Sequence, residues 1–387
     1  MMHVLWALAA ASLVAWIGLL VGRGLFWWPA PRLERGAPSG AALPRVLAVI
    51  PARNEAGILP RTLPTVLAQD YAGPFRVVLV DDRSEDETAS VARSAADGSD
   101  RADRLTVLGG KPLPTGWSGK VWAMHQGAAA NDAEWLWFTD ADIAHDPWVL
   151  SALVDLAERE NRDLVSTMAT LRIDSTWDRL LIPAFVYFFA KLYPFRFVGN
   201  PRRRTAGAAG GCILVRRSLL EQAGGIEAMR SALIDDCALG RLIKRAGGRT
   251  WLGYSKGVHS LRGYGSLASV WDMVARSAYT QLGHSPIKLV GTILGMLLVY
   301  AVAPVACVGG AIALGLGAPG AGTLAVLGGA TWGLMTASFV PMLRHHRAGG
   351  WMAPLLPLAG VLYTAMTVSS AWRHARGRGG SWKGRTY

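Results

Sequence analysis

WLWFTDAD, residues 135–142, leads from an apolar segment directly into two aspartates, Asp140 and Asp142, with one residue between them. The apolar part is short and uncharged, which indicates a buried strand. Side chains two residues apart in an extended chain point to the same side, so both carboxylates can face one ligand. The pair therefore predicts a divalent-metal site at a strand end, with an ordinary acidic surface turn as the alternative.

Two earlier apolar runs also end in polar residues, VLAVIPARNE at Val46–Glu55 and VVLVDDRSEDET at Val77–Thr88. Both runs are β-branched and uninterrupted, which is typical of parallel strands covered by helices on both faces. Parallel strands bring their carboxyl ends to one edge of a sheet, where open α/β sheets bind their ligands. We therefore expect the polar residues that follow all three strands to lie together.

This order of motifs resembles the nucleotide-diphospho-sugar glycosyltransferases of family 2, over about Arg45 to Arg262. Two further segments extend the resemblance, GWSGKVWAMHQG at Gly116–Gly127 and LIDDCALG at Leu233–Gly240. The chain is most similar to the hopene-associated glycosyltransferase group, which has a GWxGKxWA segment and a C-terminal WKGR. The resemblance implies an α/β, Rossmann-like GT-A domain and a glycosyltransferase of the hexosyltransferase type.

The chain is too apolar for an ordinary soluble enzyme, because 51% of its 387 residues are hydrophobic and its mean hydropathy is +0.25. Met2–Val21 is an uncharged run long enough to span a bilayer, and Arg23 follows it. The run lacks a basic start and a small-residue cleavage site, so we expect a retained anchor rather than a removed signal peptide. The arginines after it place the globular part in the cytoplasm, at a bacterial inner membrane.

Three further apolar segments follow the globular part, at Ile287–Gly317, Gly322–Leu343 and Trp351–Trp372. If the first two form a hairpin that ends in the cytoplasm at Arg344, a complete third crossing puts the basic tail outside. Either the third segment is re-entrant or interfacial, or the first segment crosses differently around Pro304. We favour a cytoplasmic tail, because its cations are stabilised beside an anionic inner leaflet.

The predicted organisation has six parts: an anchor at 1–23, a Pro/Gly/Ala linker at 24–44, a GT-A domain at 45–265, an amphipathic interfacial helix at 266–286, transmembrane segments at 287–372 and a basic tail at 373–387. The net charge of +13 comes from cations that cluster beside apolar segments, and no nucleic-acid motif is present. The membrane is therefore the expected partner of this charge. Cys212, Cys237 and Cys307 show no metal-ligand spacing, so we expect them to be buried in a reducing compartment.

The metal and donor sites are predicted at the strand ends. Asp142 is the expected metal ligand, and Asp140 contacts either the metal or the ribose. Oxygen ligands suit Mg²⁺ or Mn²⁺, and such an ion would help a diphosphate to leave. The resemblance implies that a nucleotide-diphosphate sugar, with a UDP-sugar expected, contacts Pro51, Ala52, Arg53, Glu55, Asp81, Asp82, Lys120 and Asp140.

Within this donor set, Asp82 is expected to accept a hydrogen bond from the base, with Asp81 supporting it. The acids at 85–87 are expected at a helix N-terminus, where they complement the helix dipole. Lys120 follows two glycines and either reaches the diphosphate or is an exposed loop lysine.

The acceptor needs a general base, and Asp235 and Asp236 precede a helix-like run, CALGRLIKRAG. Adjacent acids raise one pKa when they are desolvated together. The resemblance implies that the second acid, Asp236, is the base and that the reaction inverts the anomeric centre. A helix-capping role is the alternative for either acid. The resemblance also implies an acceptor segment in the strand-like run 206–215, through Gly210, Gly211 and Cys212, with a tight packing turn as the alternative.

Two stretches indicate a lipid acceptor. Leu180–Val198 is rich in aromatic residues and contains Lys191, so it suits an interfacial helix, with a core helix pair as the alternative. Leu267–Leu282 has apolar residues at helical spacing. The Q-x-x-R-W motif of processive members is absent, which argues against a polymerising synthase.

The sequence therefore predicts a membrane-bound inverting transfer of one sugar to a lipid, and the resemblance implies hopanoid biosynthesis. A polyprenyl-phosphate or glycerolipid sugar transferase is an alternative enzyme with the same site. A catalytically inactive GT-A membrane scaffold is the alternative outside enzymes.

Overall fold

The computed structural model describes residues 2–36, 43–379, 381–382 and 385–386, so the WKGR segment and the predicted linker lie partly outside the described residues. The chain divides into two compact units. We call one the sheet unit (Ala30–Arg172, Phe195–Gly263 and Ser381–Tyr387) and the other the helical unit (Met1–Pro29, Ile173–Pro194 and Tyr264–Gly380).

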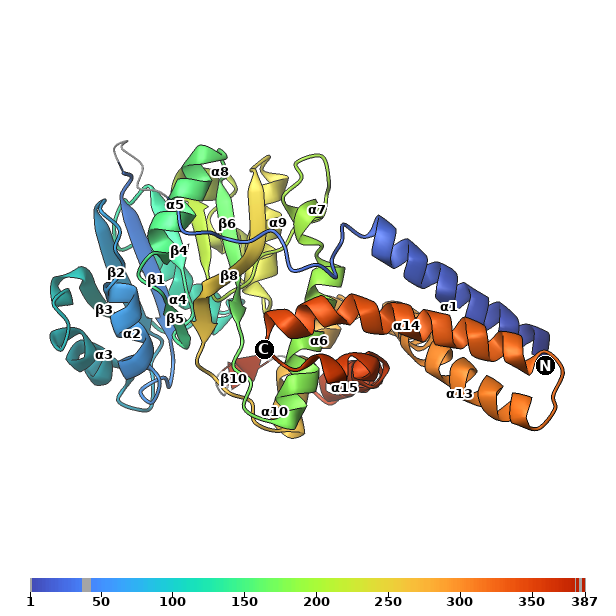
Figure 1. The fold of residues 1–387 in the computed structure, drawn as a ribbon. Coiled ribbons are helices and arrows are strands. Elements are labelled where there is room, and N and C mark those ends of the chain that lie inside the picture. The colour runs from blue at the N-terminus through green and yellow to red at the C-terminus, as the bar shows by residue number, and fades with distance from the viewer. Residues whose placement is uncertain (1, 37–42, 380, 383–384, 387) are drawn as a thin grey trace. The chain divides into compact units, whose positions relative to one another are not determined.

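An eight-stranded sheet forms the centre of the sheet unit, in the order β3-β2-β1-β4-β7-β6-β8-β5 (Figure 1). The strands are β1 Val46–Ala52, β2 Phe75–Asp81, β3 Leu105–Gly109, β4 Trp135–Phe138, β5 Ile143–His145, β6 Leu164–Thr170, β7 Ile213–Arg216 and β8 Thr250–Ser260. Strands β3, β2, β1 and β4 run parallel, which confirms the three predicted parallel strands. β7 runs antiparallel to β4 and β6, and β5 runs antiparallel to β8 at the edge.

Helices cover both faces of this sheet: α2 Leu59–Leu67, α3 Thr88–Asp97, α4 Gly119–Ala128, α5 Val149–Arg159, α8 Arg217–Gln222 and α9 Asp235–Arg245, with the short helices η1 Ala102–Arg104, α7 Phe195–Val198 and η2 Ile226–Met229. Alternate residues of β1 belong to two different cores. Val46, Ala48 and Ile50 pack with residues of α2, α3 and α5, whereas Leu47 and Val49 pack with α4 and α9. Burial on both faces explains why the β1 sequence is apolar without interruption.

Two glycines let helices approach close enough to position the site. A Cβ at Gly127 in α4 would lie 2.4 Å from Val49 Cγ1, and one at Gly240 in α9 would lie 2.8 Å from the Gly207 carbonyl carbon. Because no larger residue fits either position without movement, α4 packs directly on β1 and α9 packs directly on the loop before β7.

The helical unit consists of α1 Met2–Gly22, α6 Thr176–Leu192, α10 Leu267–Ala275, α11 Ala278–Gln281, α12 Pro286–Met296, the π-helix η3 Leu297–Ala301, α13 Val302–Gly315, α14 Ala321–His345, η4 Gly350–Leu355 and α15 Leu356–Ala375. Among the described residues, five helical segments are long and apolar enough to cross a membrane: Met2–Gly22, Thr176–Val198, Pro286–Gly315, Ala321–His345 and Gly350–Ala375. α14 packs against α1 and α13, and α15 packs on α10, α11, α12 and η3.

Some predicted elements are shorter or broken in the structure. Of the strand-like run 206–215, only the part from Ile213 is a strand, because the residues before it form a loop along α9. The helical stretch 267–282 is interrupted at Arg276–Ser277, and the stretch 180–198 is interrupted before Phe195. Pro194 accounts for the second interruption, since it disfavours helical backbone in the preceding residue.

The cysteines fit their prediction in part. Cys212 and Cys237 are buried, whereas Cys307 on α13 is partly exposed.

Candidate active site

The ends of β1 and β2 are joined by Arg53. Its guanidinium donates to the backbone carbonyls of Asp82 at 2.8 Å and Arg83 at 2.6 Å, and it pairs with the Glu85 carboxylate at 2.8 Å. Asn54 and Arg83 both adopt positive φ angles, 53° and 55°. Such backbone is uncommon outside glycine and is found where the surrounding structure holds it in place, so the two loops form one fixed surface.

The other predicted donor residues lie at this edge. Pro51 and Ala52 are the last residues of β1, and Asp82 is fully buried directly after β2, where its N–H donates to the Ala52 carbonyl at 2.8 Å. The Asp81 carboxylate accepts the Ser84 N–H at 3.1 Å.

The acids at 85–87 do not share one role. Asp86 accepts the Thr88 N–H at 3.0 Å at the start of α3, as expected for a helix N-terminus. Burial by itself would raise the pKa of Asp86, but its hydrogen bonds with Thr88 and the Ala56 N–H lower it overall. Glu85 instead pairs with Arg53.

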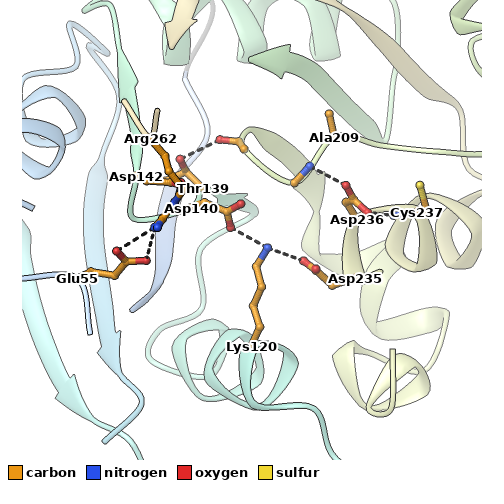
Figure 2. Close-up of polar contacts among 12 residues, drawn as sticks. Glu55, Lys120, Thr139, Asp140, Asp142, Ala209, Asp235, Asp236, Cys237 and Arg262 are labelled. Atoms are coloured by element: carbon orange, nitrogen blue, oxygen red, sulfur yellow. Dashed lines mark hydrogen bonds and ion pairs between the residues drawn. The ribbon is translucent and has the colours of Figure 1, made fainter. Parts of the chain in front are cut away.

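Lys120 lies in the first turn of α4 and joins two predicted acids (Figure 2). Its Nζ is 2.7 Å from Asp140 Oδ1 and 3.0 Å from Asp235 Oδ2. Burial alone would lower the pKa of Lys120, but Asp140 and Asp235 raise it well above its ordinary value. Lys120 is therefore a charged lysine inside the site and not the exposed loop lysine of the alternative interpretation.

Asp236 is held by backbone donors. Its Oδ2 accepts the Gly210 N–H at 3.0 Å and its Oδ1 accepts the Cys237 N–H at 2.6 Å. A Cβ at Gly210 would lie 3.5 Å from Asp140, Asp236 and Lys120 alike, so this glycine faces the point where they meet. Asp236 is itself a first-turn residue of α9, so the capping alternative and a chemical role are compatible.

Burial raises the pKa of two carboxyl groups in this cluster to about 6. For Asp236, the neighbouring Asp235 charge adds to the effect of burial, and Lys120 and the two backbone N–H groups oppose it. For Asp140, Lys120 opposes the effect of burial, while the charges of Asp142 and Asp235 add to it. A carboxylate with such a pKa can accept a proton near neutral pH.

Asp142 is bound by an arginine that the sequence did not single out. Arg262, in the loop after β8, donates from Nε to Asp142 Oδ2 at 2.6 Å and from Nη2 to both Glu55 oxygens at 3.1 Å (Figure 2). The Arg262 side chain is 42% exposed, whereas those of Asp142 and Glu55 are 17% and 11% exposed. Arg262, the more exposed partner, thus covers the predicted metal ligand Asp142. The sequence signal that could have identified Arg262 is a cation just after the end of a strand.

A second arrangement missed from the sequence fixes the β4 end. Thr139 Oγ1 donates to the Gly211 carbonyl at 3.0 Å, so the His145 Nε2, 2.8 Å away, must be the donor to that hydroxyl. Burial lowers the pKa of His145 to about 3, which keeps the ring neutral. These hydrogen bonds join Thr139, the residue before Asp140, to the predicted acceptor segment.

Cys212 does not point into the site. Its Sγ accepts the Trp137 Nε1–H at 3.3 Å inside the sheet core, and burial raises its pKa to about 11. In the predicted acceptor segment, only the backbone of Cys212 is therefore placed to contact a ligand, and the thiol is not.

The carboxylates fit a divalent ion by their chemistry, although among the described residues no three His, Cys, Asp or Glu side chains are arranged to hold a metal. Five carboxylates lie here and two cations pair with four of them: Lys120 with Asp140 and Asp235, and Arg262 with Asp142 and Glu55, whereas Asp236 is held by backbone N–H groups. All donors are oxygens, which suits Mg²⁺ or Mn²⁺.

Residues 47–224, which include the parallel strands and the aspartates at the end of β4, match the family model described as Glycosyl transferase family 2. This part of the chain is therefore similar to the family 2 glycosyltransferases.

Two curated relatives are undecaprenyl-phosphate 4-deoxy-4-formamido-L-arabinose transferases. The protein of Pseudomonas aeruginosa (strain LESB58) is 29% identical over 183 residues, which are 46% of this chain and 48% of the relative. That of Pseudomonas syringae pv. syringae (strain B728a) is 28% identical over 180 residues, 45% of this chain and 48% of the relative. The chain thus spans about half the length of these relatives.

Among solved structures, the chain is similar to a mannosyltransferase from Pyrobaculum calidifontis in complex with GDP-Man and Mn²⁺. The TM-score is 0.55 at 19% identity, over 96% of this chain and 99% of the other. At this identity the likeness shows the fold, which is GT-A-like. Together these similarities support a glycosyltransferase.

Proposed function

We propose that the protein transfers one sugar from a nucleotide-diphosphate sugar to a lipid at a bacterial inner membrane, with inversion of the anomeric centre. The observation that carries this proposal is the meeting of Asp140, Lys120 and Asp236 around Gly210 in a domain similar to the family 2 glycosyltransferases. A donor at the strand ends and an acceptor at the Gly210 loop would meet at this point.

Asp236 is the proposed general base. As an acceptor hydroxyl oxygen attacks the anomeric carbon, its proton passes to Asp236 and the bond from that carbon to the diphosphate breaks. The two backbone N–H groups orient the carboxylate, and its pKa of about 6 leaves it largely deprotonated at pH 7.

The donor would lie along the joined loops of β1 and β2. Asp82, Asp81, Arg53 and Glu55 supply polar groups beside Pro51 and Ala52, which suits a base and a ribose. Lys120 supplies a positive charge for the diphosphate. A UDP-sugar is our expected donor, on the resemblance alone.

Asp142 and Asp140 are the proposed holders of Mg²⁺ or Mn²⁺. A bound divalent ion neutralises charge on the leaving diphosphate. In support, the carboxylates of this site outnumber the cations that contact them, and the mannosyltransferase with a similar fold was solved with Mn²⁺.

The lipid acceptor is supported by the relatives, which are named for undecaprenyl phosphate, and by the apolar helices. A polyprenyl phosphate is therefore the first acceptor to test. A hopanoid is the second, because the GWSGKVWA segment at Gly116–Ala123 matches the hopene-associated pattern.

We further propose that α15 lies at the membrane surface, with the tail in the cytoplasm. α15 packs mainly on α10, α11 and the first half of the Pro286–Gly315 segment (α12 and η3), with further contacts to α6 and α14, rather than along α1 and α13. This packing favours the re-entrant or interfacial alternative over a complete third crossing.

The test is transfer by full-length protein in detergent, with a panel of labelled nucleotide sugars, with and without Mn²⁺, and with undecaprenyl phosphate or a hopanoid lipid extract as acceptor. A labelled lipid would support the proposal, and with a hydroxyl acceptor Asp236→Asn should fail to make it. If no nucleotide sugar binds or reacts under any metal, the domain is an inactive scaffold and the proposal is wrong.

A further inference from the structure

Lys191, near the end of α6 in the helical unit, is a partly buried cation with neutral partners. Its Nζ donates to the Tyr300 hydroxyl at 2.8 Å and lies 4.6 Å and 5.3 Å from the ring centres of Tyr300 and Phe188. In the described part of the chain, Lys191 forms no ion pair with a carboxylate. An ammonium group away from bulk water is costly unless an anion accompanies it.

A second cation lies beside it. Arg23 donates from Nε to the Lys191 carbonyl at 2.9 Å and from Nη2 to the Leu192 carbonyl at 3.1 Å, so it caps the negative end of α6. Arg23 likewise forms no ion pair within the described ranges. Two adjacent cations without an anion repel one another, which a shared anionic ligand would relieve.

The surrounding helices hold Tyr300 in a fixed position. It lies in the π-helix η3, four residues before Pro304, whose missing N–H prevents the regular helical bond. Trp16 donates to the Val299 carbonyl at 2.7 Å and contacts the Tyr300 ring edge-on, and a Cβ at Gly360 would lie 2.6 Å from Tyr300 Cγ. The aromatic wall beside Lys191 is therefore already formed.

The helical unit has a shortage of negative charge. Its described part contains ten lysine and arginine residues and three acids, Asp174, Asp178 and Asp272. Asp178 accepts backbone N–H groups in a capping box, and Asp272 pairs with Arg373 at 2.7 Å. None of the three pairs with Lys191 or Arg23, so an anion that balances these two cations would come from outside the described residues of this unit.

We propose that Lys191 and Arg23 form a binding site for the phosphate group of an anionic membrane lipid, with Tyr300 and Phe188 as its walls. Arg23 is the first charge after the 21-residue apolar helix α1, which in a bilayer puts it at the level of the lipid phosphates. A guanidinium and an ammonium together suit phosphate oxygens. The site does not rest on the proposed transfer reaction, because it lies outside the sheet unit.

The test is lipid binding to delipidated full-length protein in detergent, measured by native mass spectrometry without any sugar donor. The probes are undecaprenyl phosphate, phosphatidylglycerol, diacylglycerol and inorganic phosphate. We expect both phosphate lipids to bind, and Lys191→Met and Arg23→Gln each to weaken them about tenfold, as for loss of one charge-assisted hydrogen bond. Lys191→Arg, which keeps the positive charge, should retain lipid binding. Lys288→Met, which changes an exposed lysine of α12, should leave lipid binding unchanged.

Three results would overturn the proposal. Equal binding by Lys191→Met and Lys288→Met would show that the site is elsewhere. Diacylglycerol binding as tightly as the phosphate lipids would remove the role of the phosphate. Inorganic phosphate displacing the lipids at equal concentration would make it a free-phosphate site. A preference for undecaprenyl phosphate over phosphatidylglycerol would support the site as one for the acceptor, and equal binding would support a general anionic lipid.

Discussion

Replacement of Asp236 by asparagine should reduce transfer by an amount that depends on the acceptor. A hydroxyl acceptor must lose a proton as it attacks, and a positioned general base contributes roughly 10²–10⁴ in rate. A phosphate acceptor is already largely ionised at neutral pH, since its second pKa is about 6. We therefore expect Asp236→Asn to reduce the transfer rate about 10³-fold with a hydroxyl lipid and much less with a polyprenyl phosphate.

The pH profile gives a second measure of the same role. Burial raises the pKa of Asp236 to about 6, so the free carboxylate falls about tenfold for each pH unit below that value. For a hydroxyl acceptor, kcat/KM of the wild type should fall accordingly below pH 6, and the fall should be shallower in Asp236→Asn, where only Asp140 still takes up a proton in this range.

Radiolabelled transfer assays at pH 5 to 8 would follow product, and calorimetry would follow donor binding. Asp235→Asn is the matched control, because Asp235 contacts Lys120 and should alter donor affinity. If Asp236→Asn keeps wild-type rates with every active lipid, or loses as much donor affinity as Asp235→Asn, the assignment of the base is wrong.

Three further substitutions test the charges and packing of the site. Arg262→Gln should tighten Mn²⁺ binding about fivefold, measured by calorimetry without donor. The reason is that the Asp142 carboxylate is released from a partly exposed ion pair worth ~1 kcal/mol. Unchanged Mn²⁺ affinity would show that Arg262 and the metal do not compete for Asp142. Lys120→Met should lower the melting temperature at pH 7.5 but less at pH 5, because the pKa values of the nearby Asp140 and Asp236 are about 6 in the folded protein against an ordinary 3.8, so both take up protons. An equal loss at both pH values would contradict this. Gly127→Ala should cost ~1–3 kcal/mol by overpacking, measured by thermal unfolding, whereas Gly57→Ala, which meets nothing within 4 Å, should be neutral.

The strands and their acids were predictable because the signals are local. An apolar run that ends in a polar residue identifies both the strand and its carboxyl end, and this placed Asp82 and Asp140 correctly at one edge. The buried position of each run also explains its uninterrupted apolar pattern.

Arg262 could not be predicted in this way, because its partner lies 120 residues earlier. Their contact depends on the antiparallel pairing of β5 with β8, which continues in the bond from the Leu261 N–H to the Asp142 carbonyl at 2.9 Å. The pairing places a strand near the end of the domain beside one near its middle. Nothing in the local sequence of either strand specifies that neighbour, so a cation after β8 could be noticed but its contact with Asp142 could not be predicted.

The charge of the site also explains why Lys120 and Arg262 are placed as they are. The diphosphate of the donor is negatively charged, and five carboxylates lie in the proposed site. Without cations, these acids would repel both one another and the donor. Lys120 is enclosed between Asp140 and Asp235, whereas Arg262 is the more exposed cation at Asp142. Lys120 is thus suited to stay and hold the geometry, while Arg262 is suited to move aside, because its charge is shared with water and costs less to displace.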